Sequence, residues 1–111
     1  NSKYVGAVLD PVGEMQLELR FLDKISETPL ETVSKLGKNV IHVHFSDYRM
    51  TDGNIFDVDP GEGNLNVQAF LNLLKEIGYS GNLCIEYKGE STPQDPVARS
   101  REIYNKIRKY L

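Results

Sequence analysis

Residues 40–47 read VIHVHFSD, an apolar run in which two histidines alternate with β-branched and aromatic residues. Side chains two positions apart in a strand share a face, so His42 and His44 point to one side and their apolar neighbours point to the other. Two further runs, at 4–9 (YVGAVL) and 83–87 (LCIEY), have the same apolar character. The sequence therefore predicts three short buried strands.

Helical patterns alternate with these strands. Thr28-Pro29 begins one pattern, which ends at Gly37, and Asp95-Pro96 begins another near the end of the chain. Between them, Asn66 precedes an apolar stripe with i, i+3, i+4 spacing that ends at Gly78. The segment 14–25 is ambiguous, because an alternating pattern breaks at Leu22, and it fits either a loop or a short helix.

The order β–α–β–α–β–α predicts an α/β fold with parallel strands and right-handed crossovers. Three parallel strands alone would leave two unpaired edges and one uncovered face. We therefore expect residues 1–111 to be a single partial domain, made of three consecutive βα units of a (β/α)8 barrel. The chain begins with Asn rather than Met, which agrees with its being part of a longer protein.

Composition excludes several classes of protein. Thirteen Lys and Arg against sixteen Asp and Glu give a net charge of −3, which argues against a nucleic-acid-binding module. No apolar run approaches the roughly 18 residues of a membrane span. The single cysteine, Cys84, allows neither an internal disulfide nor a multi-cysteine zinc site, and we expect it to lie in the core. A cytoplasmic protein is the expectation.

Each predicted strand ends in a side chain that binds metals or moves protons: Asp10, His44 and Glu86. Alone, Asp10 before a proline is usually a turn former, and a strand histidine is often only a hydrogen-bonded core residue. Glu86 is harder to explain, because an acid among apolar neighbours needs a partner or a function. Together, at equivalent strand ends, they predict a site for Mn²⁺, Mg²⁺, Co²⁺ or Zn²⁺.

Two more residues are candidates for contacts with a substrate. Arg49 follows the second strand and can pair with an anionic or hydroxylated molecule, although a solvated arginine is an equal alternative. His42 shares the face of His44. The connection 46–65 also contains a Gly-x-Gly at 61–63, which is too weak a signal to indicate a phosphate site.

A series of motifs resembles the C-terminal part of the xylose isomerase-like TIM barrels, the sugar phosphate isomerases and epimerases. It comprises VIHVHFSD at 40–47, PGEGN at 60–64, AFLNLLKEIGYSG at 69–81 and LCIEY at 83–87. The opening VGAVLD at 5–10 resembles the sixth strand of those barrels. Inosose dehydratases and the endonuclease IV group are relatives within the superfamily.

The resemblance implies that Asp10, His44 and Glu86 are three of four metal ligands, on strands six, seven and eight. The fourth, a glutamate from an earlier strand, has no counterpart here. Glu86 would also act as the catalytic acid/base, and Arg49 lies near the substrate-contacting arginine. Ketose epimerases usually carry a histidine where this chain has Gly13, and the nuclease branch has Asp-x-His where it has Asp57-Val58-Asp59.

The function that follows is a divalent-metal-dependent sugar or sugar phosphate isomerase or epimerase that abstracts a proton α to a carbonyl. This chain would carry only part of that site, so alone it is expected to be inactive. One alternative is a metal-dependent lyase or hydrolase of the dehydratase or endonuclease IV type. The other is a non-catalytic fragment that self-associates or pairs with the N-terminal part of the barrel.

Overall fold

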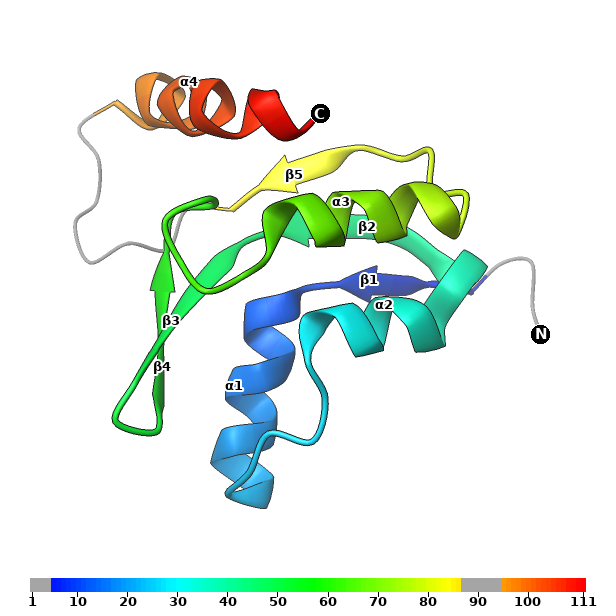
Figure 1. The fold of residues 1–111 in the computed structure, drawn as a ribbon, viewed down its shortest axis with the longest axis vertical. Helices are drawn as coiled ribbons and strands as arrows, with labels where there is room; N and C mark the ends of the chain where they lie inside the picture. The colour runs from blue at the N-terminus through cyan, green and yellow to red at the C-terminus, as the bar shows by residue number, and fades with distance from the viewer. Residues whose placement is uncertain (1–4, 87–94) are drawn as a thin grey trace.

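The computed structural model describes residues 5–86 and 95–111. Its elements alternate along the chain and are drawn in Figure 1. In order they are β1 (Ala7–Leu9), α1 (Pro11–Leu22), α2 (Pro29–Leu36), the 3-10 turn η1 (Gly37–Asn39), β2 (Val40–Phe45), β3 (Asp47–Thr51), β4 (Asn54–Val58), α3 (Val67–Glu76), β5 (Leu83–Ile85), α4 (Pro96–Ile107) and the 3-10 turn η2 (Arg108–Tyr110).

Three strands form a parallel sheet in the order β1-β2-β5, with β2 in the centre. Leu9 pairs with Val43 across β1 and β2, and Phe45 pairs with Ile85 across β2 and β5. The predicted α/β fold with three parallel strands is confirmed. The strands are shorter than their apolar runs at two places: β1 begins at Ala7, and β5 ends at Ile85, while Tyr87 lies outside the described residues.

The hydrophobic core lies on one face of this sheet. Leu9, Val43 and Phe45 are fully buried there against apolar residues of α2, α3 and α4. The rings of Phe45 and Phe70 stack with their centroids 5.9 Å apart. In Figure 1, α2 and α3 lie side by side along this face. Burying the alternate residues of the central strand in this way fixes which residues point to the other face.

The opposite face of the sheet is open. His42 and His44 lie on it, as does Cys84, which pairs with His44 and is exposed. Val8, the partner of His42 in β1, is 52% exposed. The expectation of a core position for Cys84 is therefore wrong, because its strand turns it to the side opposite the helices. In a complete barrel this side faces the interior, which side chains from other strands fill.

Two parts of the fold differ from the sequence-based expectation. Most of the ambiguous segment 14–25 belongs to α1, so the helical alternative is correct, but the helix begins earlier, at Pro11, and ends at Leu22. The connection 46–65 contains the antiparallel hairpin β3–β4, which was not predicted. Its turn has Asp52 at φ 50° and Gly53 at φ 75°, the left-handed conformations that suit an Asp-Gly hairpin turn.

The helices α1, α2 and α4 begin in the same way, with a capping side chain followed by proline. Asp10 accepts a hydrogen bond from the Gly13 amide, Thr28 from the Glu31 amide, and Asp95 from the Ala98 amide. Proline at the first helical position costs no hydrogen bond, since that amide has no partner within the helix. These signals end the extended backbone abruptly, so only one residue, Asp10, separates the end of β1 from the start of α1.

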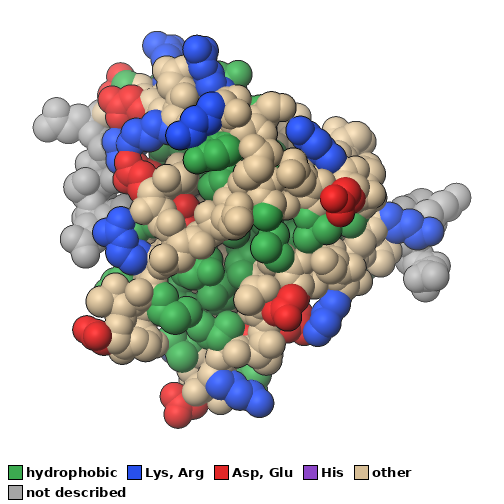
Figure 2. Space-filling model, in the orientation of Figure 1, with side chains coloured by type: hydrophobic (Ala, Val, Ile, Leu, Met, Phe, Trp, Pro, Cys, Tyr) green, Lys and Arg blue, Asp and Glu red, His purple; other side chains and the backbone are tan. Residues whose placement is uncertain are grey.

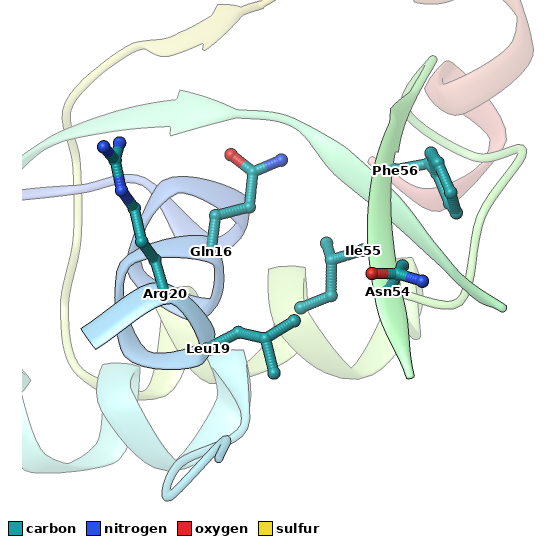
Figure 3. A pocket seen from close by; sticks show the side chains of 6 residues that line it. All are labelled: Gln16, Leu19, Arg20, Asn54, Ile55 and Phe56. Carbon is teal, nitrogen blue, oxygen red and sulfur yellow. The ribbon is translucent and has the colours of Figure 1, made fainter. Parts of the chain in front are cut away.

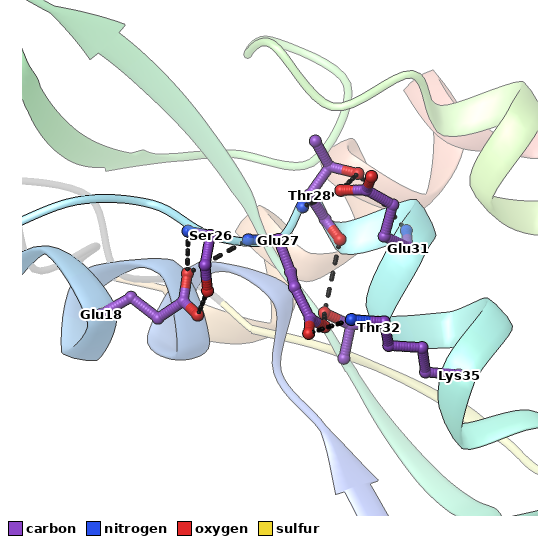
Figure 4. Close-up of polar contacts among 7 residues, drawn as sticks. All are labelled: Glu18, Ser26, Glu27, Thr28, Glu31, Thr32 and Lys35. Atoms are coloured by element: carbon purple, nitrogen blue, oxygen red, sulfur yellow. Dashed lines mark hydrogen bonds and ion pairs between the residues drawn. The ribbon is translucent and has the colours of Figure 1, made fainter. Parts of the chain in front are cut away.

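The segment between α1 and α2 is held by polar contacts, shown in Figure 4. The Glu18 carboxylate accepts a hydrogen bond from the Ser26 amide at 2.8 Å, and the Thr28 amide donates to Glu31 at 2.7 Å. Glu27 pairs with Lys35 of α2. These contacts are exposed and contribute little energy individually, but together they fix the direction in which the chain turns back along the sheet. None of the helices in the described part of the chain is both long and apolar enough to cross a membrane.

Glu14 of α1 gives the first testable prediction. Partial burial raises its pKa above the ordinary value of 4.5, and this outweighs a hydrogen bond to the backbone of Asp10, which lowers the pKa. A raised pKa means that ionised Glu14 destabilises the folded chain at neutral pH, and this cost disappears below pH 4.5, where folded and unfolded forms are both protonated. Glu14→Gln should therefore increase the free energy of unfolding at pH 7. The increase should shrink as the pH falls toward 4.5.

Urea unfolding followed by circular dichroism at pH 4 to 7 measures this difference. Glu76→Gln, at an exposed position of α3, is the matched control. A stability difference for Glu14→Gln that stays constant over this pH range would contradict the assignment.

Candidate metal centre

Asp10, His44 and Glu86 come together at the C-terminal ends of the three parallel strands. Each offers one ligand atom, and these atoms all lie within 4.8 Å of one another. His44 Nδ1 is 3.5 Å from Glu86 Oε2, and the two side chains are 38% and 28% exposed. The fold thus brings these residues together although the first and the last, Asp10 and Glu86, are 76 positions apart in the sequence. The three residues meet because the strands are parallel, and the C-terminal ends of parallel strands lie at the same edge of the sheet.

The alternation of side chains along the strands places all three residues on the open face. Asp10 follows the core residue Leu9, and Glu86 follows Ile85, so each lies on the side of the sheet opposite the core. The Glu86 amide donates to the carbonyl oxygen of Phe45 at 3.1 Å, which continues the pairing of β5 with β2 one residue beyond the strand. That bond keeps Glu86 beside His44.

The donor set fits a divalent cation. Ligand atoms about 2.1 Å from one ion are about 3.4 Å apart in a tetrahedral site and about 4.2 Å apart when opposite. The distance between His44 and Glu86 is already in this range. All ligand atoms of the set lie within 4.8 Å of one another, so small side-chain rotations would bring them to the distances that one ion requires. Two carboxylates and one imidazole suit Mn²⁺, Mg²⁺, Co²⁺ and Zn²⁺, and they do not select one of these metals.

The carboxylate of Asp10 is held from two sides. Its Oδ1 accepts hydrogen bonds from the Gly13 amide at 3.1 Å and from the Ser46 hydroxyl at 3.2 Å. Gly13 is needed for this arrangement, since a Cβ there would lie 2.6 Å from Asp10 Oδ2. From the sequence, Gly13 was only a departure from the epimerase pattern, and Ser46 was not predicted to have a role. The signal for Ser46 in the sequence was its place as a small polar residue directly after a buried strand.

The two predicted substrate contacts are placed differently. His42 lies on the open face beside His44, with the rings edge to face and their centroids 5.1 Å apart. Arg49 is exposed on β3, and its Nη2 donates to the carbonyl oxygen of Glu62 at 3.0 Å. The histidine is therefore next to the candidate metal ligands, whereas the arginine is held by the loop after the hairpin. A substrate role for either residue stays a prediction.

Comparison with known proteins identifies the family to which the fold belongs. The profile of a family described as Xylose isomerase-like TIM barrel matches residues 1–109. The chain belongs to this family. The family includes sugar isomerases and epimerases as well as endonuclease IV-like enzymes, and it typically uses divalent metals.

Two relatives support the assignment. A solved xylose isomerase domain protein from Planctomyces limnophilus superposes with a TM-score of 0.72 and 27% identity, over 98% of this chain and 39% of the solved chain. An uncharacterized protein of Methanocaldococcus jannaschii, MJ1311, is 44% identical over 86 residues, which are 75% of this chain and 26% of that protein. This chain spans about a quarter of one relative and two fifths of the other.

In this member of the family, the loop at 59–65 is organised by a buried aspartate. Asp47 is 1% exposed, and its carboxylate accepts four backbone hydrogen bonds. The donors are the amides of Tyr48 at 2.7 Å, Gly61 at 3.0 Å, Gly63 at 2.9 Å and Leu65 at 2.9 Å. A Cβ at Gly63 would lie 2.3 Å from Asp47 Oδ1, so only glycine allows this close approach. The two glycine amides of the Gly-x-Gly motif thus bind the Asp47 carboxylate in this structure.

The same loop is tied to the last helix. Asp59, which is 4% exposed, pairs with Arg99 of α4, and Glu62 pairs with Lys106. On the face shown in Figure 2, Lys and Arg side chains gather over α4 with acidic side chains among them. Arg99 and Lys106 of α4 are therefore ion-pair partners of the loop.

A groove separates α1 from the hairpin at the same edge of the sheet (Figure 3). Its volume is about 340 Å³. It is lined by Gln16, Leu19, Arg20, Asn54, Ile55 and Phe56. The Gln16 amide also donates to Asp57 Oδ2 at 2.9 Å, which joins the helix to β4. Both walls of the groove follow strands whose ends carry candidate ligands, since α1 follows β1 and the hairpin follows β2.

Substituting Asp47 tests the organisation of this loop. Asp47→Asn replaces one acceptor oxygen by an NH₂ group that faces backbone donors, so at least one buried hydrogen bond is lost. We expect the free energy of unfolding to fall by about 2–4 kcal/mol. Chemical denaturation measures this loss. Asp52→Asn in the exposed hairpin turn is the control, and equal effects of the two substitutions would contradict the role given to Asp47.

Proposed function

We propose that this chain provides three metal ligands and the proton-transferring carboxylate of a divalent-metal-dependent sugar or sugar phosphate isomerase or epimerase. The observation that carries the proposal is the convergence of Asp10, His44 and Glu86 at the C-terminal edge of the sheet. Family membership supports it, because the family includes enzymes of this class. The relatives are much longer than this chain, so the complete activity belongs to a protein that also supplies the remaining strands.

Bound between these side chains, a divalent ion would act as a Lewis acid that stabilises negative charge on the sugar oxygen next to the reacting carbon. Asp10 and His44 would hold the ion. Glu86 would hold it through its carboxylate and would also remove the proton α to the carbonyl. The opposing acid, from a strand outside this chain, would return the proton.

The surroundings of the cluster suit a small polyhydroxylated substrate. His42 presents an imidazole on the same face as the ligands. The groove between α1 and the hairpin adds the polar groups of Gln16, Arg20 and Asn54 to an otherwise apolar lining. Polar groups set on an apolar surface are typical of pockets that orient one small molecule. A lyase acting on a related polyol would use the same ligands, and product analysis distinguishes it from an isomerase.

Metal binding by the chain itself is the first test. Titration of Mn²⁺ and of Zn²⁺ by calorimetry should give micromolar dissociation constants, and His44→Ala should weaken binding by more than about 100-fold because a direct ligand is lost. His42→Ala is the matched control, since it removes the neighbouring imidazole from the same face. Equal binding by the wild type and His44→Ala would refute the metal centre.

Catalysis is tested in a protein that contains this chain together with the rest of the barrel. Glu86→Gln keeps the size of the side chain but removes the base. It should lower exchange of the substrate's α proton with deuterium from the solvent by about 10²–10⁴-fold, the usual contribution of a general base. A panel of ketoses and ketose phosphates followed by NMR provides the measurement. Exchange at the wild-type rate would show that another group is the base.

A further inference from the structure

Ser46 lies directly after the central strand, between the cluster and the buried aspartate that organises the next loop. Its side chain is 2% exposed, and its hydroxyl donates to Asp10 Oδ1 at 3.2 Å. The two residues are 36 positions apart in the sequence. This bond therefore connects the end of β2 to the end of β1, at the level of the candidate metal ligands.

The position of Ser46 is itself fixed by its neighbours. Phe45 is fully buried in the core on one side of it, and Asp47 is anchored by four backbone amides on the other. The hydroxyl is consequently delivered to Asp10 by a rigid stretch of backbone. The Gly13 amide, at the start of α1, donates to the same oxygen. Two donors from different elements thus converge on Asp10 Oδ1.

We propose that Ser46 is a positioning residue of the metal centre, whose hydroxyl orients the Asp10 carboxylate toward a divalent cation. The inference rests on the proposed function, because it assumes that Asp10 is a ligand. Asp10 has two rotatable side-chain bonds, and a carboxylate that must become ordered on binding loses affinity. Hydrogen bonds that order a ligand in advance remove this loss, and such partners are typically worth 10–100-fold in metal affinity.

The experiment compares metal binding by variants at Ser46 in the chain described here. Ser46→Ala removes the hydroxyl without adding volume, and Ser46→Thr retains it. Ser34→Ala is the matched control, since Ser34 is an exposed serine of α2 that bonds to the carbonyl of Leu30. Mn²⁺ affinity is measured by calorimetry. The visible absorption of bound Co²⁺ is recorded in parallel, because it reports the geometry of the ligands and is not altered by a change in fold stability alone.

We expect Ser46→Ala to bind Mn²⁺ about 10-fold or more weakly and to change the Co²⁺ spectrum. Ser46→Thr should stay close to the wild type in both readouts, and Ser34→Ala should match it. Thermal unfolding without metal checks that each variant is folded. If the threonine does not fit the buried position, the Co²⁺ spectrum of Ser46→Ala still decides, because a folded variant in which the ligand geometry is unchanged should give an unchanged spectrum.

The outcomes separate this inference from the proposed function. Wild-type binding that persists unchanged in Ser46→Ala, with the same Co²⁺ spectrum, would overturn the role of Ser46 and leave the metal centre in place. Failure of the wild-type chain to bind either ion would remove the metal centre, and the inference with it. Equal weakening in Ser46→Ala and Ser34→Ala would also overturn the inference, because the effect would then not depend on Asp10.

Discussion

The rest of the structure depends on the alternation of side chains in the central strand β2. Its apolar residues Val43 and Phe45 are fully buried against the helices, and this burial sets the face to which His42 and His44 turn. A shift of one residue in register would place the histidines in the core and expose the phenylalanine. Burial of the apolar residues therefore sets the direction of the His44 side chain, and the contacts of its own ring are not needed for this. The parallel pairing with β1 and β5 then brings Asp10 and Glu86 to the same side.

Much of this arrangement could be predicted from the sequence because the signals are local and strong. The three strands are short apolar runs, and α2, α3 and α4 begin at capping residues that the sequence displays directly. The convergence of Asp10, His44 and Glu86 needed one further step, the rule that parallel strands end at a common edge. The alternating order of strands and helices predicted that the strands are parallel, so the rule could be applied without any knowledge of distances.

The missed elements were missed for physical reasons. Helix α1 has apolar residues on several sides, including the exposed Leu17 and Phe21, so it lacks the single stripe that marks an amphipathic helix. Its Asp10-Pro11 start matches the starts of α2 and α4, but Asp10 was interpreted only as a turn former or a ligand. The hairpin has only five residues in each strand, and its Asp52-Gly53 turn was the one signal that indicated it. Cys84 was misplaced because a sequence of three strands does not show which face lacks its cover.

Asp10 explains why the fold of this region and its chemistry are coupled. The same carboxylate caps α1 through the Gly13 amide and joins the candidate metal ligands. A capping interaction is worth about 1 kcal/mol, so a cation that draws the carboxylate away from the helix would have to offset that loss. Gly13 and Ser46 avoid the conflict by donating to a single oxygen from the side of the helix and of β2. One position of the Asp10 carboxylate thereby caps α1, bonds to Ser46 after β2 and lies among the candidate ligands. This arrangement requires α1 to follow β1 closely, with Asp10 alone between them.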